Sequence, residues 1–359
     1  MLRSDISKCK NYVPIDYIKT ELIEFNCINL VHESSLNFGE LINSDTGEFV
    51  KRFSSNGIEK KPCRTALHKN LVFRFYPETG RLFLSGSLHT YWNNGEHNAN
   101  LFDIGAFNEV LNELNSLFGI KPYHLKITQI EWGVNISPPI KSNAIIDACL
   151  FQKWVRFEVK YDNSEGKYHQ AEHKKYYIIK IYNKGLQFGL GKEMLRFERK
   201  QLDYLKYSKQ KGIGQTLSDL INSDFIGMKE TLLFNLNEIL FFSPLIKDEN
   251  YKMMRYRDPL FWVDLRRDVS STMVHKHIKK LRHLNSSKGG DMQGQLSELI
   301  DEAIASANSN KLQDSSFSYN KNTATIDIES IKLCQLTYLD ISMQKTESLY
   351  LSHAGLWHL

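Results

Sequence analysis

The residues whose types suggest chemistry are two carboxylates, a tyrosine and a pair of histidines in a sequence of 359 residues. Glu131 and Glu198 are the carboxylates, and the segment GSLHTYWNNGEHNANLF, residues 86–102, contains both histidines. Two carboxylates and one or two imidazoles can hold a divalent cation, Mg²⁺ or Mn²⁺, that polarises a phosphoryl oxygen. Tyr182 beside such a cation could attack the phosphorus. Because the ordinary pKa of tyrosine is about 10, Lys184 or the metal would have to favour the phenolate.

Strands would bring these side chains to one surface. Three segments read as strands by their alternation of apolar and polar residues: 126–136, 176–184 and 194–200. Because residues two apart in a strand point the same way, Glu131, Tyr182 and Glu198 each lie on the polar face of their strand. If the strands belong to one sheet, these faces combine into a surface with two carboxylates, a tyrosine and several cations. The alternative is an exposed sheet face with Glu–Lys cross-strand pairs.

The remaining patterns predict an α+β fold. Residues 71–76 and 81–89 flank the turn PETG and give a hairpin signal. The apolar stretch 22–31 reads as another strand, and residues 107–118 have the spacing of an amphipathic helix that stops at Gly119. We therefore expect a central, mostly antiparallel β-sheet with flanking helices, followed by a mainly helical C-terminal region.

The length suggests two domains, or one large domain with a helical annex. The pattern predicts a first domain over residues 1–225, a helical basic region over 226–285, and a linker with a C-terminal segment over 286–359. Within this last part, SSKGGDMQGQ reads as a flexible linker and QLSELIDEAI as a short amphipathic helix. Residues 306–325 have the composition of a loop.

The composition favours a protein of the cytosol. Hydrophobic residues make up 42% and charged residues 24% of the chain, which are ordinary values for a globular protein. No apolar run approaches the roughly 18 residues of a membrane-spanning helix, and MLRSDISKCK carries charges where a signal peptide would place its apolar segment. Five scattered cysteines with no C-x-x-C pair indicate reduced thiols, with neither a disulfide framework nor a zinc knuckle.

Positive charge is concentrated between Lys252 and Lys288. That segment has ten Lys and Arg residues against three Asp, a balance of +7, whereas the whole chain has a formal net charge of +5. Tyr256, Phe261 and Trp262 stand among the cations, a mixture that suits a polyanion with stackable bases. The cations predicted to contact its phosphates are Lys276, Lys279, Lys280 and Arg282. The alternative is the solvated basic face of a helix.

The order of these segments resembles that of a known family. GSLHTYWNNGEHNANLF, an amphipathic helix, QIEWGVNI, IKIYNKGLQ and MLRFERKQLDYLKY follow one another over roughly residues 70–225. This order resembles the gene II type replication initiators of filamentous phages and their rolling-circle plasmid relatives. The resemblance implies a phage- or plasmid-encoded protein of the bacterial cytosol, with an initiator-like endonuclease domain. Such a protein nicks one strand of an origin through a tyrosine with a divalent metal, forms a phosphotyrosine intermediate and later rejoins the strand.

The resemblance also implies roles for individual residues. Its Gly-then-His-Asn element falls on Gly95, His97 and Asn98. His97 is then the first choice for a histidine metal ligand, His89 is the second, and Asn98 is a DNA contact. The acidic strand falls on Glu131, where the phage proteins tend to have Asp. The chain lacks the His-hydrophobe-His motif of many rolling-circle enzymes.

The Tyr-x-Lys element of the family falls on Tyr182 and Lys184, which become the nucleophile and its activating lysine. The Arg-Phe-Glu strand falls on Arg196, a DNA contact, and on Glu198, a metal ligand. Four other tyrosines are close enough in sequence to be alternative nucleophiles: Tyr176, Tyr177, Tyr204 and Tyr207.

Three functions agree with the sequence. The first is a tyrosine-dependent initiator that nicks and rejoins DNA, the second is an origin-binding or regulatory protein without chemistry, and the third is a metal-dependent nuclease that uses water. Tyr182 beside Lys184 favours the first over the third, and the set His97, Glu131 and Glu198 favours it over the second. The expected partners are double-stranded origin DNA and the nicked single strand, with a host helicase and polymerase as further candidates and no membrane.

Overall fold

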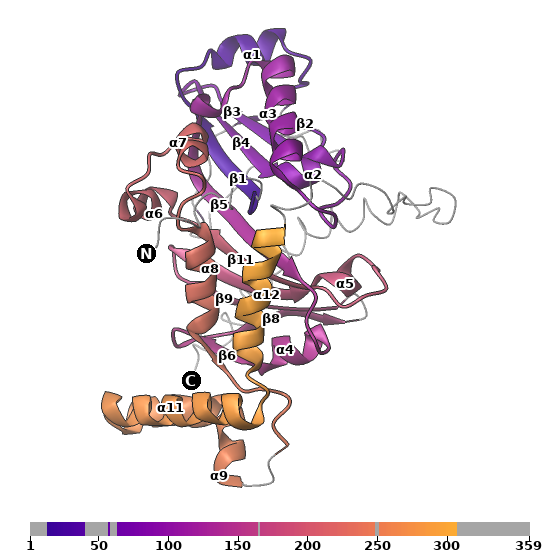
Figure 1. Ribbon diagram of the computed structural model, residues 1–359. Helices are drawn as coiled ribbons and strands as arrows, with labels where there is room; N and C mark the ends of the chain where they lie inside the picture. Colours follow the sequence, from indigo (N-terminus) through magenta and orange to yellow (C-terminus); the bar gives the residue numbers. More distant parts are fainter. Residues whose placement is uncertain (1–12, 40–56, 58–62, 164–165, 248–250, 307–359) are drawn as a thin grey trace, which may run out of the picture. The chain divides into compact units, whose positions relative to one another are not determined.

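A nine-stranded antiparallel sheet forms the centre of the part of the chain that the computed structural model describes (Figure 1). The described residues are 13–39, 57, 63–163, 166–247 and 251–306. All of them except Gly57 belong to one compact unit. The strand order is β2-β3-β4-β1-β5-β11-β10-β9-β8. In chain order the strands are β1 (Ile15–Leu22), β2 (Arg64–His68), β3 (Leu71–Tyr76), β4 (Arg81–Ser87), β5 (Leu125–Ile136), β8 (Glu158–Asn163), β9 (Gly166–His173), β10 (Tyr177–Asn183) and β11 (Leu195–Gln201).

Two helices, α8 (Met228–Asn237) and α12 (Met292–Ser306), lie side by side across β5 and β11 and bury one face of the sheet (Figure 1). Trp132 of β5 is fully buried under them, and its indole Nε1 donates to the carbonyl oxygen of Met228 at 3.2 Å. Because side chains alternate along a strand, the neighbouring Glu131 lies on the opposite face. The apolar core therefore lies on one face of β5, and the predicted polar surface lies on the other.

The other elements surround this sheet or extend beyond it. A second sheet has three strands in the order β12-β6-β7: β12 (Ile239–Phe241), β6 (Cys149–Gln152) and β7 (Val155–Arg156). The remaining helices are α1 (Cys27–Glu33), α2 (Leu88–Trp92), α3 (Ile104–Phe118), α4 (Ser142–Ala148), α5 (Lys184–Gln187), α6 (Tyr204–Lys211), α7 (Leu217–Asn222), α9 (Tyr251–Met254), α10 (Pro259–Asp268) and α11 (Ser271–Lys288). Two short 3₁₀ helices are η2 (Pro122–His124) and η3 (Arg255–Arg257). None of the helices in the described ranges has both the length and the apolarity needed to cross a membrane.

The α+β prediction, an antiparallel sheet with flanking helices and a helical C-terminal part, is confirmed. The predicted hairpin corresponds to β3 and β4. The predicted amphipathic helix is α3, in which the Asp103 side chain accepts a hydrogen bond from the backbone N–H of Ala106 at 2.9 Å. Gly119 ends this helix with a left-handed φ of 68°, a conformation that glycine adopts without steric cost.

The prediction of a strand over residues 22–31 is wrong. The strand β1 ends at Leu22, and the second half of the apolar stretch belongs to helix α1. The side chain of Asn26 caps this helix by accepting a hydrogen bond from the N–H of Asn29 at 3.1 Å. A short apolar run fits a strand and a buried helix equally well, so here the capping asparagine decides.

The prediction of a flexible linker over residues 286–295 is also wrong. Helix α11 continues to Lys288, and α12 begins at Met292 after a short turn. Met292 is only 1% exposed, so it is packed into the core rather than carried by a linker. The predicted loop over 306–325 lies outside the described residues apart from Ser306, and the domain boundaries at 225 and 285 stay predictions.

Candidate active site

Three neighbouring strands bring the predicted residues together on one face of the sheet. The cross-strand pairs of β10, β11 and β5 are Lys180 with Glu198, Tyr182 with Arg196, Lys200 with Glu131, and Glu198 with Gly133. All of these positions are on the face opposite Trp132. Glu131, Tyr182 and Glu198 therefore share one surface, as their alternation in the sequence predicts.

Glu198 lies at the centre of this cluster. Its side chain is almost fully buried, and Oε2 accepts hydrogen bonds from Arg196 Nε at 2.8 Å and from the Tyr182 hydroxyl at 3.3 Å. The other oxygen, Oε1, pairs with Lys180 Nζ at 3.1 Å. Burial opposes ionisation, but the charges and hydrogen bonds of Lys180 and Arg196 outweigh it and hold the pKa of Glu198 at about 2. Glu198 is thus ionised at any physiological pH.

Two lysines neutralise the second carboxylate, Glu131. Lys180 Nζ lies 2.7 Å from Glu131 Oε2, and Lys200 Nζ lies 2.7 Å from Glu131 Oε1. Because Lys180 also contacts Glu198, it links the two carboxylates across β10, β11 and β5. These are the Glu–Lys cross-strand pairs that sequence analysis considers as an alternative, but Glu131 is buried rather than exposed.

A third carboxylate, Asp16 of β1, completes the cluster and is missed by the sequence analysis. Its Oδ1 accepts a hydrogen bond from the Ser87 hydroxyl at 2.5 Å. Its Oδ2 accepts hydrogen bonds from Asn98 Nδ2 at 2.8 Å and from Arg196 Nη2 at 3.2 Å. Asp16 therefore ties the strand that carries Arg196 to the loop that carries Asn98.

A β-bulge explains the orientation of Asp16. Ile15 pairs with Trp132 and Tyr17 pairs with Glu131, so two steps along β1 correspond to one step along β5. Asp16 is the extra residue between them. Strict alternation would put it on the core face, and a bulge redirects such a side chain.

Tyr182, the predicted nucleophile, is half-buried beside Glu198. Burial, and then the charge of the Glu198 carboxylate, raise the pKa of Tyr182 well above the ordinary value. Its ring packs edge-on against that of Tyr168, with 5.5 Å between the ring centroids. The Tyr168 hydroxyl donates to Gln170 Oε1 at 2.7 Å instead of to the cluster. In the resting protein Tyr182 is thus a neutral phenol.

Lys184 is a fully buried lysine at the start of α5, immediately after β10 ends. Its Nζ donates a hydrogen bond to the carbonyl oxygen of Asn98 at 2.5 Å. Burial, and then the charge of Arg196, lower the pKa of Lys184 to about 7. The amine is therefore poised to exchange a proton near neutral pH.

The two histidines predicted as metal ligands contact their own loop. His89 belongs to α2, since β4 ends at Ser87, and its Nε2 lies 2.7 Å from Asn100 Oδ1. Burial is the main reason why the pKa of His89 falls to about 4. His97 is half-buried, and its Nδ1 accepts a hydrogen bond from the N–H of Ala99 at 3.4 Å.

The asparagines of residues 86–102 mainly hold this loop together. Asn93 and Asn100 exchange amide hydrogen bonds of 2.8 and 3.1 Å, and Asn93 Nδ2 also donates to the carbonyl oxygen of His97 at 2.9 Å. These contacts agree with an asparagine-rich turn stabilised by its own side chains. Asn98 differs, because it connects the loop to Asp16 and Lys184.

The predicted metal ligands do not form a metal site in this arrangement. Both oxygens of Glu131 and both of Glu198 are paired with cations. Across the described ranges, no three side chains of His, Cys, Asp or Glu are placed to share a metal ion. A divalent cation requires several free oxygen or nitrogen ligands. The Mg²⁺ or Mn²⁺ ion therefore stays a prediction from the resemblance.

Gly133 makes room for Glu198, and we expect Gly133→Ala to damage the cluster. A Cβ at this position would come within 2.5 Å of the carbonyl oxygen of Phe197 and 2.7 Å of Glu198 Cα. Overpacking of this kind costs about 1–3 kcal/mol of unfolding free energy. Urea denaturation measures the loss. The control is Gly39→Ala, because no atom lies within 4 Å of its added Cβ. Equal stability of the two variants would contradict the close approach.

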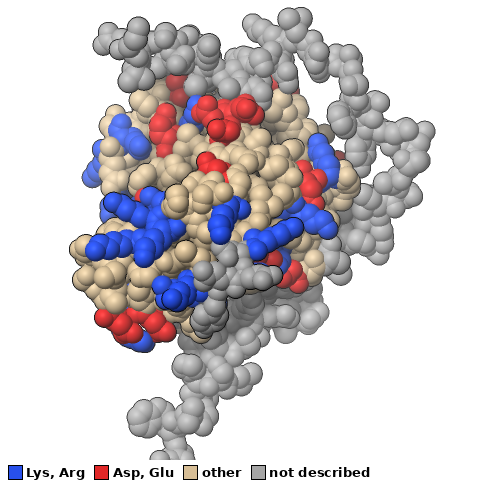
Figure 2. Space-filling model, turned by 60° about the horizontal axis from the view of Figure 1, so that its bottom comes forward, with Lys and Arg blue, Asp and Glu red and all other residues tan. Residues whose placement is uncertain are grey.

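The predicted DNA-contacting cations of α11 are on the surface. Lys276, Lys279, Lys280 and Arg282 are all exposed. Figure 2, in which the side of the protein that bears α11 in Figure 1 comes forward, shows Lys and Arg side chains gathered across this face.

The prediction that aromatic residues among these cations are available for stacking on bases is wrong for Tyr256 and Trp262. Both are buried, and their rings stack with 5.4 Å between centroids. Trp262 Nε1 donates to the carbonyl oxygen of Tyr256 at 2.8 Å. These two rings form a small core beneath the basic surface, because burying their apolar area is more favourable than exposing it.

Known proteins resemble this chain in structure more than in sequence. No family model and no curated protein match the chain. The structure is similar to that of the rolling circle replication initiator protein from Geobacillus stearothermophilus, at 12% sequence identity and a TM-score of 0.36. The match covers 68% of this chain and 90% of that one.

Proposed function

We propose that this protein is a DNA replication initiator that binds an origin and cuts and rejoins one strand through Tyr182. The observation that carries the proposal is the hydrogen bond from the Tyr182 hydroxyl to Glu198 at 3.3 Å, beside Lys180 and Arg196. Lys180 and Tyr182 belong to one motif of the resemblance, and Arg196 and Glu198 belong to another. The fold brings the two motifs together around one candidate nucleophile.

The proposed reaction is a transesterification. The Tyr182 oxygen attacks a DNA phosphorus, a bond from phosphorus to tyrosine forms, and the bond to the 3′ oxygen breaks and leaves a 3′ hydroxyl that takes up a proton. The reverse attack by a 3′ hydroxyl rejoins the strand. Lys180 and Arg196 would stabilise the negative charge that develops on the phosphoryl oxygens.

The proton of Tyr182 needs an acceptor, and Lys184 suits this role better than Glu198. Because the pKa of Glu198 is held at about 2 and that of Tyr182 is raised well above its ordinary value, Glu198 is too weak a base to take this proton. A base with a pKa near the working pH is more effective, and the pKa of Lys184 is about 7. Its amine would have to leave the carbonyl oxygen of Asn98 when DNA binds.

The test is incubation of the full-length protein with supercoiled DNA that carries candidate origins, in Mg²⁺, in Mn²⁺ and in EDTA. The expected product is a nicked circle with protein attached to its 5′ end, detected as an adduct that survives denaturing electrophoresis. Loss of the adduct in EDTA would support a requirement for a divalent metal ion. Nicking without an adduct would indicate a nuclease that uses water, and would contradict the proposal.

A second candidate is a DNA-binding protein without chemistry. One observation favours it: Asp16, Glu131 and Glu198 are each paired with a cation, as in a structural ion network. Such a protein would bind origin DNA in the same assay and leave the circle intact.

We expect the exposed cations of α11 to contribute affinity for duplex DNA without sequence preference. Replacing Lys276, Lys279, Lys280 and Arg282 by Gln should flatten the log–log dependence of affinity on salt by about 0.9 for each cation that contacts a phosphate. Affinity for origin and non-origin duplexes should fall alike, because phosphate contacts carry little sequence information. Fluorescence anisotropy in a salt series measures both effects.

The control for this variant replaces three exposed cations of another helix, Lys206, Lys209 and Lys211 of α6. It lowers the net charge without changing α11. An unchanged salt slope in the α11 variant, or the same change in both variants, would show that α11 is not a specific DNA-contacting surface.

A further inference from the structure

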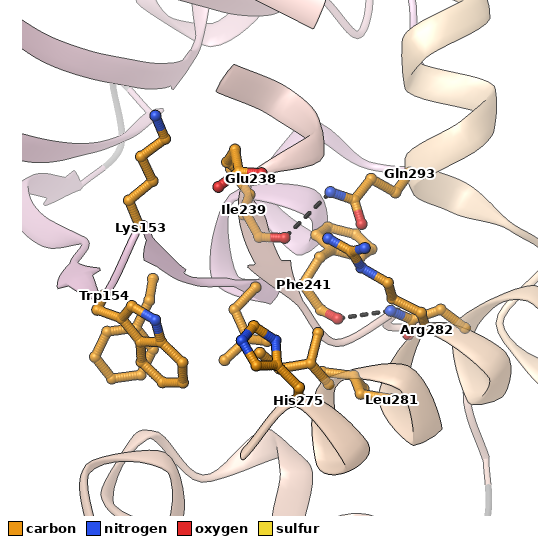
Figure 3. Close-up of a pocket in the computed structure, with 13 residues that line it drawn as sticks. Lys153, Trp154, Glu238, Ile239, Phe241, His275, Leu281, Arg282 and Gln293 are labelled. Carbon is orange, nitrogen blue, oxygen red and sulfur yellow. Dashed lines mark hydrogen bonds between the residues drawn. The ribbon is translucent and has the colours of Figure 1, made fainter. Parts of the chain in front are cut away.

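A cavity of about 330 Å³ lies between the β6–β7 hairpin, β12 and α11 (Figure 3). This volume is at the lower end of the roughly 300–1,000 Å³ of small-molecule pockets, which suits one ring system with a small substituent. Phe151 and Leu281 contribute apolar walls. Two hydrogen bonds of the buried Asn285 hold α11 against this sheet: Nδ2 donates to Phe241 O at 2.7 Å, and Oδ1 accepts from Ser243 N at 3.0 Å.

A strained turn presents Trp154 to the cavity. Gln152 pairs with Val155, so Lys153 and Trp154 are the two central residues of the β6–β7 hairpin turn. Both have positive φ, 46° and 67°. Turns of this kind favour Asn-Gly, because a large side chain in the left-handed conformation is costly. Strain of this sort is concentrated at functional sites. The indole packs against Phe151 and Trp262, with 6.3 and 6.5 Å between ring centroids, and it also lines the cavity.

The charges around Trp154 suit an anion attached to a ring. Arg266 lies over the indole, with 5.0 Å from its guanidinium carbon to the ring centroid. His275 and Arg282 of α11 also line the cavity, and Figure 3 shows His275 between Trp154 and Arg282. Glu238 also lines the cavity, and its carboxylate can accept a hydrogen bond from an exocyclic amine.

We propose that this cavity binds one unpaired nucleotide, with its base against Trp154 and its phosphate near His275 and Arg282. Stacking on an aromatic side chain is the usual way in which proteins bind unpaired bases. The inference rests on the proposed function, since DNA opened or cut at the origin supplies the nucleotide. A free nucleotide has the same chemistry and is the other source.

The test uses fluorescence anisotropy of a labelled short single strand and of a duplex of the same length. Trp154→Ala should weaken binding of the single strand by roughly 5- to 150-fold, the usual effect of one lost stacking partner. His275→Ala should weaken it less. The matched control is His283→Ala, an exposed histidine of the same helix that does not line the cavity. Duplex affinity should be the same for all four proteins.

Two further arms complete the test. Trp154→Phe keeps an aromatic ring in the turn and should bind the single strand with intermediate affinity, which separates stacking from misfolding of the hairpin. If a deoxynucleoside monophosphate displaces the single strand from the wild type but not from His275→Ala, free nucleotides also enter the cavity. If it does not displace the strand from the wild type, the cavity binds the strand alone. The inference would be overturned if Trp154→Ala and His275→Ala bound the single strand as tightly as the wild type does. The affinity of the same proteins for the duplex tests the proposed function separately.

Discussion

Replacement of Tyr182 by Phe is expected to abolish the covalent adduct between protein and DNA. The substitution removes the hydroxyl that would attack phosphorus, and no other atom of the side chain can form the phosphotyrosine bond. The protein should still fold, because the variant loses one hydrogen bond of 3.3 Å to the ionised Glu198, worth about 1.5–3 kcal/mol. Origin binding should persist for the same reason. Denaturing electrophoresis of the protein with labelled origin DNA measures the adduct.

The control for this experiment is Tyr168→Phe. Its ring contacts that of Tyr182, but its hydroxyl is directed to Gln170. The expected result is a normal adduct from Tyr168→Phe and none from Tyr182→Phe. A normal adduct from Tyr182→Phe would remove the nucleophilic role from this residue, and its loss in Tyr168→Phe would transfer the role to Tyr168.

Lys184→Met is expected to stabilise the fold and to impair cleavage. Burial lowers the pKa of Lys184 from 10.5 to about 7, which corresponds to a cost of about 5 kcal/mol at neutral pH and below. Methionine has a similar length and no charge. It leaves the carbonyl oxygen of Asn98 without its partner, at a cost of about 1–3 kcal/mol. The net gain in unfolding free energy is therefore about 2–4 kcal/mol at pH 7.

The sign of the pH dependence makes this prediction specific. Between pH 7 and 10.5 the unfolded chain binds a proton at Lys184 that the folded chain does not, so the stability of the wild type rises with pH. The advantage of Lys184→Met should then shrink as the pH rises and reverse before pH 10.5, because the unpartnered carbonyl oxygen of Asn98 costs about 1–3 kcal/mol at every pH. Urea denaturation at several pH values measures it, with Lys175→Met, an exposed lysine at the other end of β10, as the control. A variant less stable than the wild type at pH 7 would contradict the burial cost.

Sequence periodicity is sufficient to place the centre of the candidate site. Glu131, Tyr182 and Glu198 belong to regular strands, and a period of two residues determines which face each occupies. The rest of the site depends on irregular features. Asp16 is rotated toward Arg196 by a bulge, and alternation alone would direct it to the core. Nothing local in the sequence signals that bulge.

The position of His89 on a helix instead of a strand has a different cause. The Ser87 side chain accepts a hydrogen bond from the N–H of Thr90 at 2.9 Å, which starts helix α2 and turns His89 toward Phe102. A serine in this position is compatible with a strand end as well as with a helix cap, so the composition of residues 86–102 suggests a ligand loop. Tertiary packing decides that its polar groups mostly satisfy one another.

The place of β1 in the sheet has a consequence for folding during synthesis. β1 is the earliest strand of the sheet, yet it lies between β4 and β5, and Asp16 contacts Arg196 across a separation of 180 residues. At ribosomal speeds of about 5–20 residues per second, Arg196 follows Asp16 by roughly 10–40 s. During that interval the carboxylate of Asp16 has no guanidinium partner. The sheet can close around β1 once β5 has emerged, but the contact that ties Asp16 to β11 is a late, long-range step that waits for Arg196.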